Sequence, residues 1–187
     1  MAHQIYMHLF FGKTPNGYFS DFLVENEKSK VQVGEAKENK SGYPFFTSGE
    51  AIYKWNKPLC DGRCIYLNTG GNADVKFYVG KAAYSTDTWC ISFDNELTDY
   101  MYLMLYTMKE ELNKKYFQGT GLKHLQKPQL SKMKVYIPKE KELSLFNGMV
   151  KLAFETISHN FQENEALKST REYLLPLLLN GQISVKN

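Results

Sequence analysis

The chain has 187 residues, of which 43% are hydrophobic, 14% aromatic and 23% charged, and its net charge at neutral pH is +3. This length and composition suit one globular domain with an extension, and they exclude a chain with too few apolar side chains to form a core. The small net charge excludes nucleic-acid binding through overall charge alone, so such binding would need a local cluster of basic residues.

The first 40 residues carry the weakest signals. The start, "MAHQIYMHLFF", has no basic region, and its apolar run is too short for a signal peptide or a membrane span. We therefore expect a cytoplasmic protein without a membrane segment. Pro15, Asn16 and Gly17 predict a turn, and residues 31–33 predict a short strand, whereas the role of residues 1–25 stays open.

From residue 43 onward the pattern is typical of β-strands. Three short runs are dense in β-branched and aromatic residues: "RCIYLN" at 63–68, "VKFYVG" at 75–80 and "TWCISF" at 88–93. The stretch "NTGGNAD" at 68–74 predicts a turn between the first two.

The cysteines indicate buried thiols rather than a metal site. "CDGRC" spaces Cys60 and Cys64 like half of a zinc site, but no second Cys or His pair lies near it in the sequence. Cys90 is 26 residues away, and His3, His8, His124 and His159 are scattered. We expect free thiols in an apolar core and no metal.

A helix is predicted over residues 99–116, with Thr98 or Asp99 as its N-cap, and a last strand over residues 134–137 that Pro138 stops. Residues 109–141 hold nine lysines and three acidic residues. Such a basic strip could contact phosphates, although a solvated surface would look the same.

The segment after residue 139 has a helical period and no proline before Pro176, which should kink or end the helix; Asn180-Gly181 supplies a stop signal. Seven of ten positions, spaced alternately four and three residues apart, are apolar, as in the stripe of a coiled coil. About 37 helical residues would extend roughly 55 Å, which is longer than the domain that the helix leaves. We therefore expect the stripe to pack on another long helix. The alternative is a helix folded back along its own domain. The stripe consists of Phe146, Val150, Ala153, Ile157, Asn160, Asn164, Leu167, Arg171, Leu174 and Leu178.

The sequence contains no pattern typical of an enzyme. It has no phosphate-binding loop, no dinucleotide fingerprint and no zinc-protease motif. One alternative is a Mg²⁺-dependent nuclease built from Asp61, Asp74 and Lys76.

Polar residues at predicted loop tips favour binding instead, because such side chains can read base edges while lysines hold phosphates. The other interpretation of each residue is that it simply forms a turn. The candidate DNA-binding residues are Thr47, Ser48, Lys54, Asn68, Thr69, Asn72, Lys76, Lys81, Gln118, Thr120, Lys123 and His124.

Four segments in this order resemble the specificity (S, HsdS) subunits of type I restriction-modification systems. They are "YPFFTSGEAIYKWN", "DGRCIYLNTGGNADVKFYVGKAAYSTDTW", "GTGLKHLQKPQLSKMKVYIP" and "LLPLLLNGQI". The resemblance implies an α+β target recognition domain, with a twisted and mainly antiparallel sheet and flanking helices, over residues 1–138. A long dimerisation helix and tail would follow over residues 139–187.

The resemblance also implies a function without catalysis. The family commonly carries two recognition domains and two long helices, so this chain looks like a half subunit that pairs through antiparallel helices and reads one half of a bipartite site on double-stranded DNA. S-adenosylmethionine, ATP and Mg²⁺ would be held by the partner methyltransferase (M) and restriction (R) subunits. Pairing with a second copy or with another S-type chain both stay open, as does a coiled-coil protein-interaction module without DNA specificity.

Overall fold

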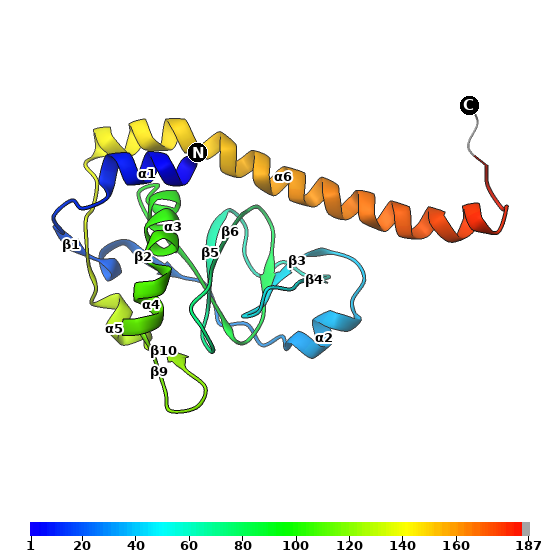
Figure 1. Ribbon diagram of the computed structural model, residues 1–187, viewed down its shortest axis with the longest axis horizontal. Helices are drawn as coiled ribbons and strands as arrows, with labels where there is room; N and C mark the ends of the chain where they lie inside the picture. Colours follow the sequence, from blue (N-terminus) through cyan, green and yellow to red (C-terminus); the bar gives the residue numbers. More distant parts are fainter. Residues whose placement is uncertain (185–187) are drawn as a thin grey trace.

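Two β-sheets face each other across a layer of aromatic side chains, and one long helix runs along the domain and beyond it (Figure 1). The computed structural model describes residues 1–184. The larger sheet is fully antiparallel and has the strand order β2-β8-β5-β6. Its strands are β2 Leu23–Glu25, β5 Arg63–Asn68, β6 Val75–Val79 and β8 Thr88–Phe93. The three strands predicted from the sequence are thus confirmed.

The central strand β5 is buried on both faces, which explains its nearly continuous apolar sequence. Ile65 and Leu67 belong to the main core beneath α1 (Ala2–Phe10), α3 (Thr98–Thr107) and α6 (Glu140–Leu179). Cys64 and Tyr66 alternate with them and face the second sheet.

The second sheet has the order β4-β3-β7 and consists of β3 Tyr43–Phe46, β4 Ile52–Trp55 and β7 Ala83–Tyr84. Phe46 stacks on Tyr66 with a centroid distance of 4.1 Å. Only the β3–β7 pair of this sheet is parallel, so the expected α+β fold with mainly antiparallel sheets is confirmed.

Residues 1–25, whose role the sequence left open, form part of the domain core. Helix α1 (Ala2–Phe10) packs against α3 and α6, and its Tyr6 and Phe10 are buried. Two small antiparallel pairs complete the strands. They are β1 (Gly17–Tyr18) with β11 (Lys134–Val135), and β9 (Phe117–Gln118) with β10 (His124–Leu125). The remaining short helices are η1 Phe19–Phe22, α2 Val33–Glu38 and α5 Lys127–Ser131.

Four local predictions are wrong. Val33 begins α2 rather than ending a strand, because Gln32 and Glu35 form a capping box there. The single helix expected over 99–116 is two helices, α3 (Thr98–Thr107) and α4 (Lys109–Lys115), that meet at Met108.

The cap of α3 and the last strand also differ from expectation. Leu97 is the N-cap of α3, since the Thr98 hydroxyl instead exchanges hydrogen bonds with the backbone of Phe93. The last strand ends at Val135, because the backbone N–H of Ile137 donates to the side chain of Asn16 at 2.6 Å.

The C-terminal helix α6 (Glu140–Leu179) has 40 residues, which corresponds to about 60 Å. Its first half packs on its own domain, where Phe146 and Val150 are fully buried and Phe154 is 6% exposed. The expectation that Phe146 and Val150 contact a partner helix is therefore wrong, because the domain core already covers them.

The C-terminal end of α6 extends past the sheets (Figure 1), whereas residues 161–169 contact the second sheet. Ala153 is half-buried, and the stripe positions after it are exposed: Ile157, Asn160, Asn164, Leu167, Arg171, Leu174 and Leu178. The helix continues three residues past Pro176 and ends at Asn180, where Gly181 takes a positive φ of 65°. Within residues 1–184, no helix is long and apolar enough to cross a membrane.

Candidate nucleic-acid interface

Four loops meet at one end of the two sheets, which we call the loop end: residues 47–51, 69–74, 85–87 and 119–123. Helix α6 lies at the opposite end of the same strands. Arg63, at the start of β5, bonds Glu155 of α6, and the backbone N–H of Val79, at the end of β6, donates to Ser158. Because β5 has six residues, the loop end lies about 17 Å from these contacts. In Figure 1 the β9–β10 hairpin accordingly lies on the side away from α6.

Asn68 organises the 69–74 loop from inside. Its amide Nδ2 donates to the carbonyls of Gly70, at 2.8 Å, and Asn72, and its Oδ1 accepts from the backbone N–H of Asp74 at 2.7 Å. Asn68 is only 3% exposed, so its polar atoms are used by its own loop. The prediction that Asn68 reads a base edge is therefore wrong, and the turn-forming interpretation holds.

Thr47 and Lys76 have the same internal role in the neighbouring loop. Thr47 is 4% exposed and its hydroxyl donates to the carbonyls of Gly49 and Ala51. Lys76 Nζ donates to the carbonyls of Thr47 and Gly49, at 2.9 and 2.7 Å. Because both side chains bond their own loop, the prediction that Thr47 and Lys76 contact DNA is wrong.

Asp74 is neutralised by two lysines, Lys76 at 3.0 Å and Lys109 at 2.9 Å. Burial raises the pKa of Asp74, but the hydrogen bonds from Lys109 and Lys76 outweigh it, so the pKa lies below its usual value. Asp61 precedes β5 and Asp74 follows it, so the two carboxylates lie at opposite ends of that strand. The nuclease site of Asp61, Asp74 and Lys76 does not form, and that alternative is wrong.

The β9–β10 hairpin brings the most accessible candidates together. Its backbone is tied to the 69–74 loop, since Gly71 N–H donates to Lys123 O at 2.9 Å and Leu125 N–H donates to Thr69 O at 3.0 Å. Gly119 has a φ of 152°, and a Cβ there would lie 2.5 Å from Leu122 O, so only glycine fits this bend. Six predicted residues thus gather on one surface: Thr69, Asn72, Gln118, Thr120, Lys123 and His124.

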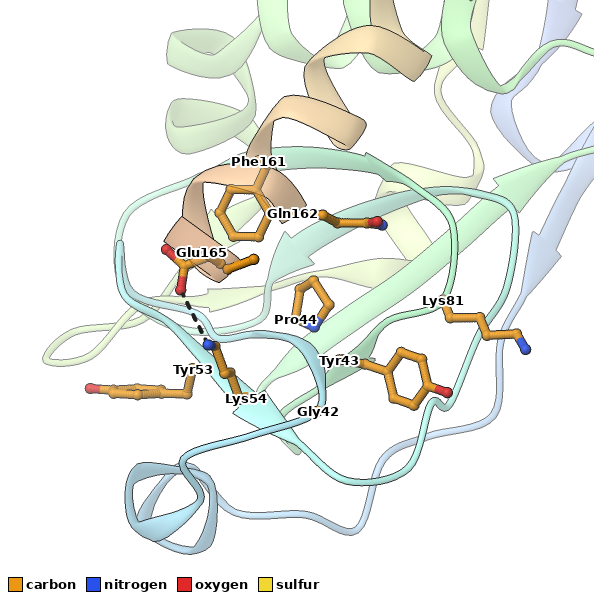
Figure 2. Close-up of a pocket in the computed structure, with 10 residues that line it drawn as sticks. Gly42, Tyr43, Pro44, Tyr53, Lys54, Lys81, Phe161, Gln162 and Glu165 are labelled. Carbon is orange, nitrogen blue, oxygen red and sulfur yellow. Dashed lines mark ion pairs between the residues drawn. The ribbon is translucent and has the colours of Figure 1, made fainter. Parts of the chain in front are cut away.

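Lys54 and Lys81 lie elsewhere, at the junction between the second sheet and α6 (Figure 2). Lys54 Nζ lies 3.1 Å from Ser169 Oγ and 3.8 Å from Glu165 Oε2. The junction encloses a cavity of about 480 Å³, lined also by Tyr53 and Phe161. These contacts hold the small sheet to α6, so both lysines lie away from the loop end. The last of the predicted DNA-binding residues, Ser48, lies at the loop end and is half-buried beside Thr47.

The lysine strip is only partly paired. Lys109, Lys114 and Lys115 have carboxylate partners within 4.0 Å. No carboxylate of residues 1–184 lies within that distance of the other six: Lys123, Lys127, Lys132, Lys134, Lys139 and Lys141.

At the loop end the sequence analysis missed Leu122, and it included Lys127 only as one lysine of the basic strip. Lys127 Nζ lies 4.6 Å from the ring centroid of Trp89, and burial lowers its pKa. Leu122 is 64% exposed at the hairpin tip between Gly121 and Lys123. The signal for Leu122 was an apolar residue inside the glycine-rich "GTGLKH".

Comparison with known proteins gives a consistent result. Residues 21–168 match the family described as Type I restriction modification DNA specificity domain. The Type I restriction enzyme EcoDI specificity subunit of Escherichia coli is 23% identical over 166 residues, which cover 87% of this chain and 37% of that protein.

Two solved structures have a similar fold. The S subunit of a type I restriction-modification system from M. genitalium has a TM-score of 0.57 and 15% identity, over 89% of this chain and 45% of that one. The HsdS subunit from Thermoanaerobacter tengcongensis has a TM-score of 0.54 and 12% identity, over 97% of this chain and 50% of that one. The chain therefore spans half or less of the relatives it matches.

Proposed function

We propose, from the premise that this chain belongs to the type I restriction-modification DNA specificity family, that its loop end reads one half of a bipartite DNA site. In this proposal residues 1–138 form the recognition domain, and the part of α6 that leaves the domain supplies the spacer and the pairing surface. The chain itself carries out no reaction.

The observation that carries the proposal is the grouping of accessible polar side chains on a fixed backbone. Gln118, Thr120 and His124 are exposed on the hairpin, and Asn72 is exposed on the adjacent loop. Buried Asn68 and backbone hydrogen bonds hold both loops in one arrangement. Base readout requires donors and acceptors that protrude from a rigid support, which this surface offers.

Phosphate contacts would come from lysines beside that surface. Lys123 lies on the hairpin and Lys127 follows β10, and neither has a carboxylate within 4.0 Å among the described residues. Affinity for DNA should therefore fall steeply as salt rises.

The exposed apolar positions of α6 suit a second long helix. Leu167 is 59% exposed and Leu174 is 36% exposed, so both side chains are accessible to a partner. Pairing two copies about a two-fold axis would hold two loop ends apart, and the DNA site would then be an interrupted inverted repeat. Methylation would belong to a methyltransferase subunit that binds S-adenosylmethionine, and cleavage to an ATP- and Mg²⁺-dependent restriction subunit.

The test is a methylome. The chain is produced together with its methyltransferase subunit in a host without other modification systems, and modified adenines are mapped. We expect one interrupted motif: a symmetric motif indicates pairing of two copies, and an asymmetric motif indicates a second S-type chain. A soluble complex that methylates no defined motif would contradict the proposal.

A second candidate is a protein-interaction module that uses α6 alone. The exposed leucines of α6 favour it equally, since they need only a helical partner. It predicts that the chain binds a protein through α6 while substitutions at the loop end change nothing.

A further inference from the structure

We propose that Cys60, Cys64 and Cys90 form a site for a thiophilic divalent metal ion, with Zn²⁺ as the expected occupant. The three Sγ atoms all lie within 4.8 Å of one another, and none of the three cysteines forms a disulfide. This inference is independent of the proposed DNA-reading function.

The fold, rather than the sequence, creates this cluster. Cys64 lies on β5, and Cys90 of β8 pairs with Tyr66, two residues further along β5 on the same face. Cys60 precedes β5 and is brought over that face by an isolated bridge to Ala82. The third ligand that the "CDGRC" motif lacked is therefore supplied by a neighbouring strand.

The geometry requires little adjustment. With a zinc–sulfur distance of about 2.3 Å, tetrahedral coordination places sulfur atoms roughly 3.8 Å apart, so an ion needs the thiols to draw together by about 1 Å at most. The three cysteines are 1–8% exposed, so a bound ion would be shielded from solvent.

Two polar side chains contact the sulfur atoms. The Tyr66 hydroxyl lies 3.2 Å from Cys60 Sγ, and the Asn26 amide Nδ2 lies 4.0 Å from Cys64 Sγ. In a metal-bound cluster the Tyr66 hydroxyl would donate to the Cys60 thiolate rather than bind the ion.

Charge selects a divalent ion. Binding replaces three thiol protons, which leave to solvent, by one metal ion, so a divalent ion leaves a net charge of −1 in the core and a monovalent ion leaves −2. A buried charge is costly, so the divalent ion is preferred. Sulfur ligands select Zn²⁺ over Mg²⁺ or Ca²⁺.

One cavity reaches the cluster at Cys90. It has a volume of about 330 Å³, and its charged lining residues are Glu25, Glu27, Asp87, Lys28 and Lys127. The bound ion would join Cys60, β5 and β8, and would thereby fix the second sheet on the first.

The experiment measures metal in the full-length chain, purified with and without added Zn²⁺ under reducing conditions. Metal content is determined by mass spectrometry, and Cd²⁺ is then titrated into chelator-treated protein while the thiolate-to-metal charge-transfer absorption and the Tm are followed. We expect one equivalent of metal per chain and a Tm that rises with Cd²⁺ concentration.

Cys60→Ser, Cys64→Ser and Cys90→Ser should each weaken Cd²⁺ binding by a factor of about 100 or more. Ser85→Ala is the matched control, since Ser85 is fully buried beside the same sheet and its hydroxyl bonds the Thr88 hydroxyl rather than a cysteine. It should keep one equivalent of Cd²⁺ even if its Tm falls. Wild-type protein that contains no metal and shows no Cd²⁺ absorption would overturn the proposal whatever the variants do.

Discussion

Arg63, the first residue of β5, donates two parallel hydrogen bonds of 2.7 Å to Asp99 in the first turn of α3, from Nε to Oδ1 and from Nη2 to Oδ2. The Asp99 side chain is 2% exposed, whereas that of Arg63 is 21% exposed. Arg63 also bonds Glu155 of α6 at 2.7 Å and the carbonyl of Lys151. One guanidinium therefore fixes the position of the sheet relative to α3 and to the long helix.

Removal of Arg63 should be costly because it leaves the Asp99 carboxylate buried without a partner. We expect Arg63→Met to lower the free energy of unfolding by about 3–5 kcal/mol, measured by urea denaturation. The double variant R63M/D99L should lose less than R63M alone, since no unpaired charge remains. Lys114→Ala is the control, because its partner Glu110 is 95% exposed and such pairs contribute about 0–1 kcal/mol. A double variant less stable than R63M would contradict this account.

Asn68 and Asn72 are four residues apart but should behave in opposite ways. Asn68→Ala removes a buried side chain that bonds three backbone groups, so we expect a loss of stability of about 1–3 kcal/mol together with loss of site-specific methylation. Asn72→Ala should keep the stability and change the recognised sequence, because Asn72 is exposed. Equal effects of the two variants on stability would show that the loop is not held by Asn68.

Lys123 and Lys81 test where DNA binds. Lys123 lies at the loop end, whereas Lys81 lines the junction with α6. Lys123→Ala should weaken DNA binding at every sequence and reduce the slope of log affinity against log salt by about 1, as one phosphate contact is lost. Lys81→Ala should change neither quantity in fluorescence anisotropy titrations over a range of salt concentrations. The reverse result would move the interface to the helix junction.

The two halves of α6 should respond differently to substitution. Leu167→Glu and Leu174→Glu alter exposed positions, so we expect loss of self-association in sedimentation experiments without loss of monomer stability. Phe154→Ala, within the core, should cost about 3–5 kcal/mol in unfolding. Self-association that survives both leucine variants would mean that another surface joins the chains.

Glu142 predicts a pH dependence at the start of α6. Hydrogen bonds from Lys13, from the Tyr136 hydroxyl and from the backbone N–H of Lys139 lower its pKa to about 2 from 4.5. Since the folded-state pKa is depressed, this contribution to stability is present above pH 4.5 and is lost as the pH falls from 4.5 toward 2. Thermal unfolding of Glu142→Gln should lack that part of the pH dependence, whereas at pH 7 it should be less stable than the wild type.

The amino-acid sequence by itself determined the local elements with strong patterns. The apolar and aromatic runs at 63–68, 75–80 and 88–93 predicted strands, since such residues gain most from a pleated surface. The period of residues 140–179 and the Asn180-Gly181 stop defined a long helix. Both features depend on spacing along the chain, which the sequence displays directly.

Only the tertiary structure decided what individual polar residues do. Asn68 and Asn72 look alike in a turn, yet one is buried and the other exposed, because which of them faces inward depends on the neighbouring strands. Phe146 and Leu174 belong to one apolar stripe, but the domain covers only the first. The approach of Cys90 to Cys60 and Cys64 depends on the antiparallel register of β5 and β8, which joins residues distant along the chain. Contacts of that kind arise from packing, and no local pattern specifies them.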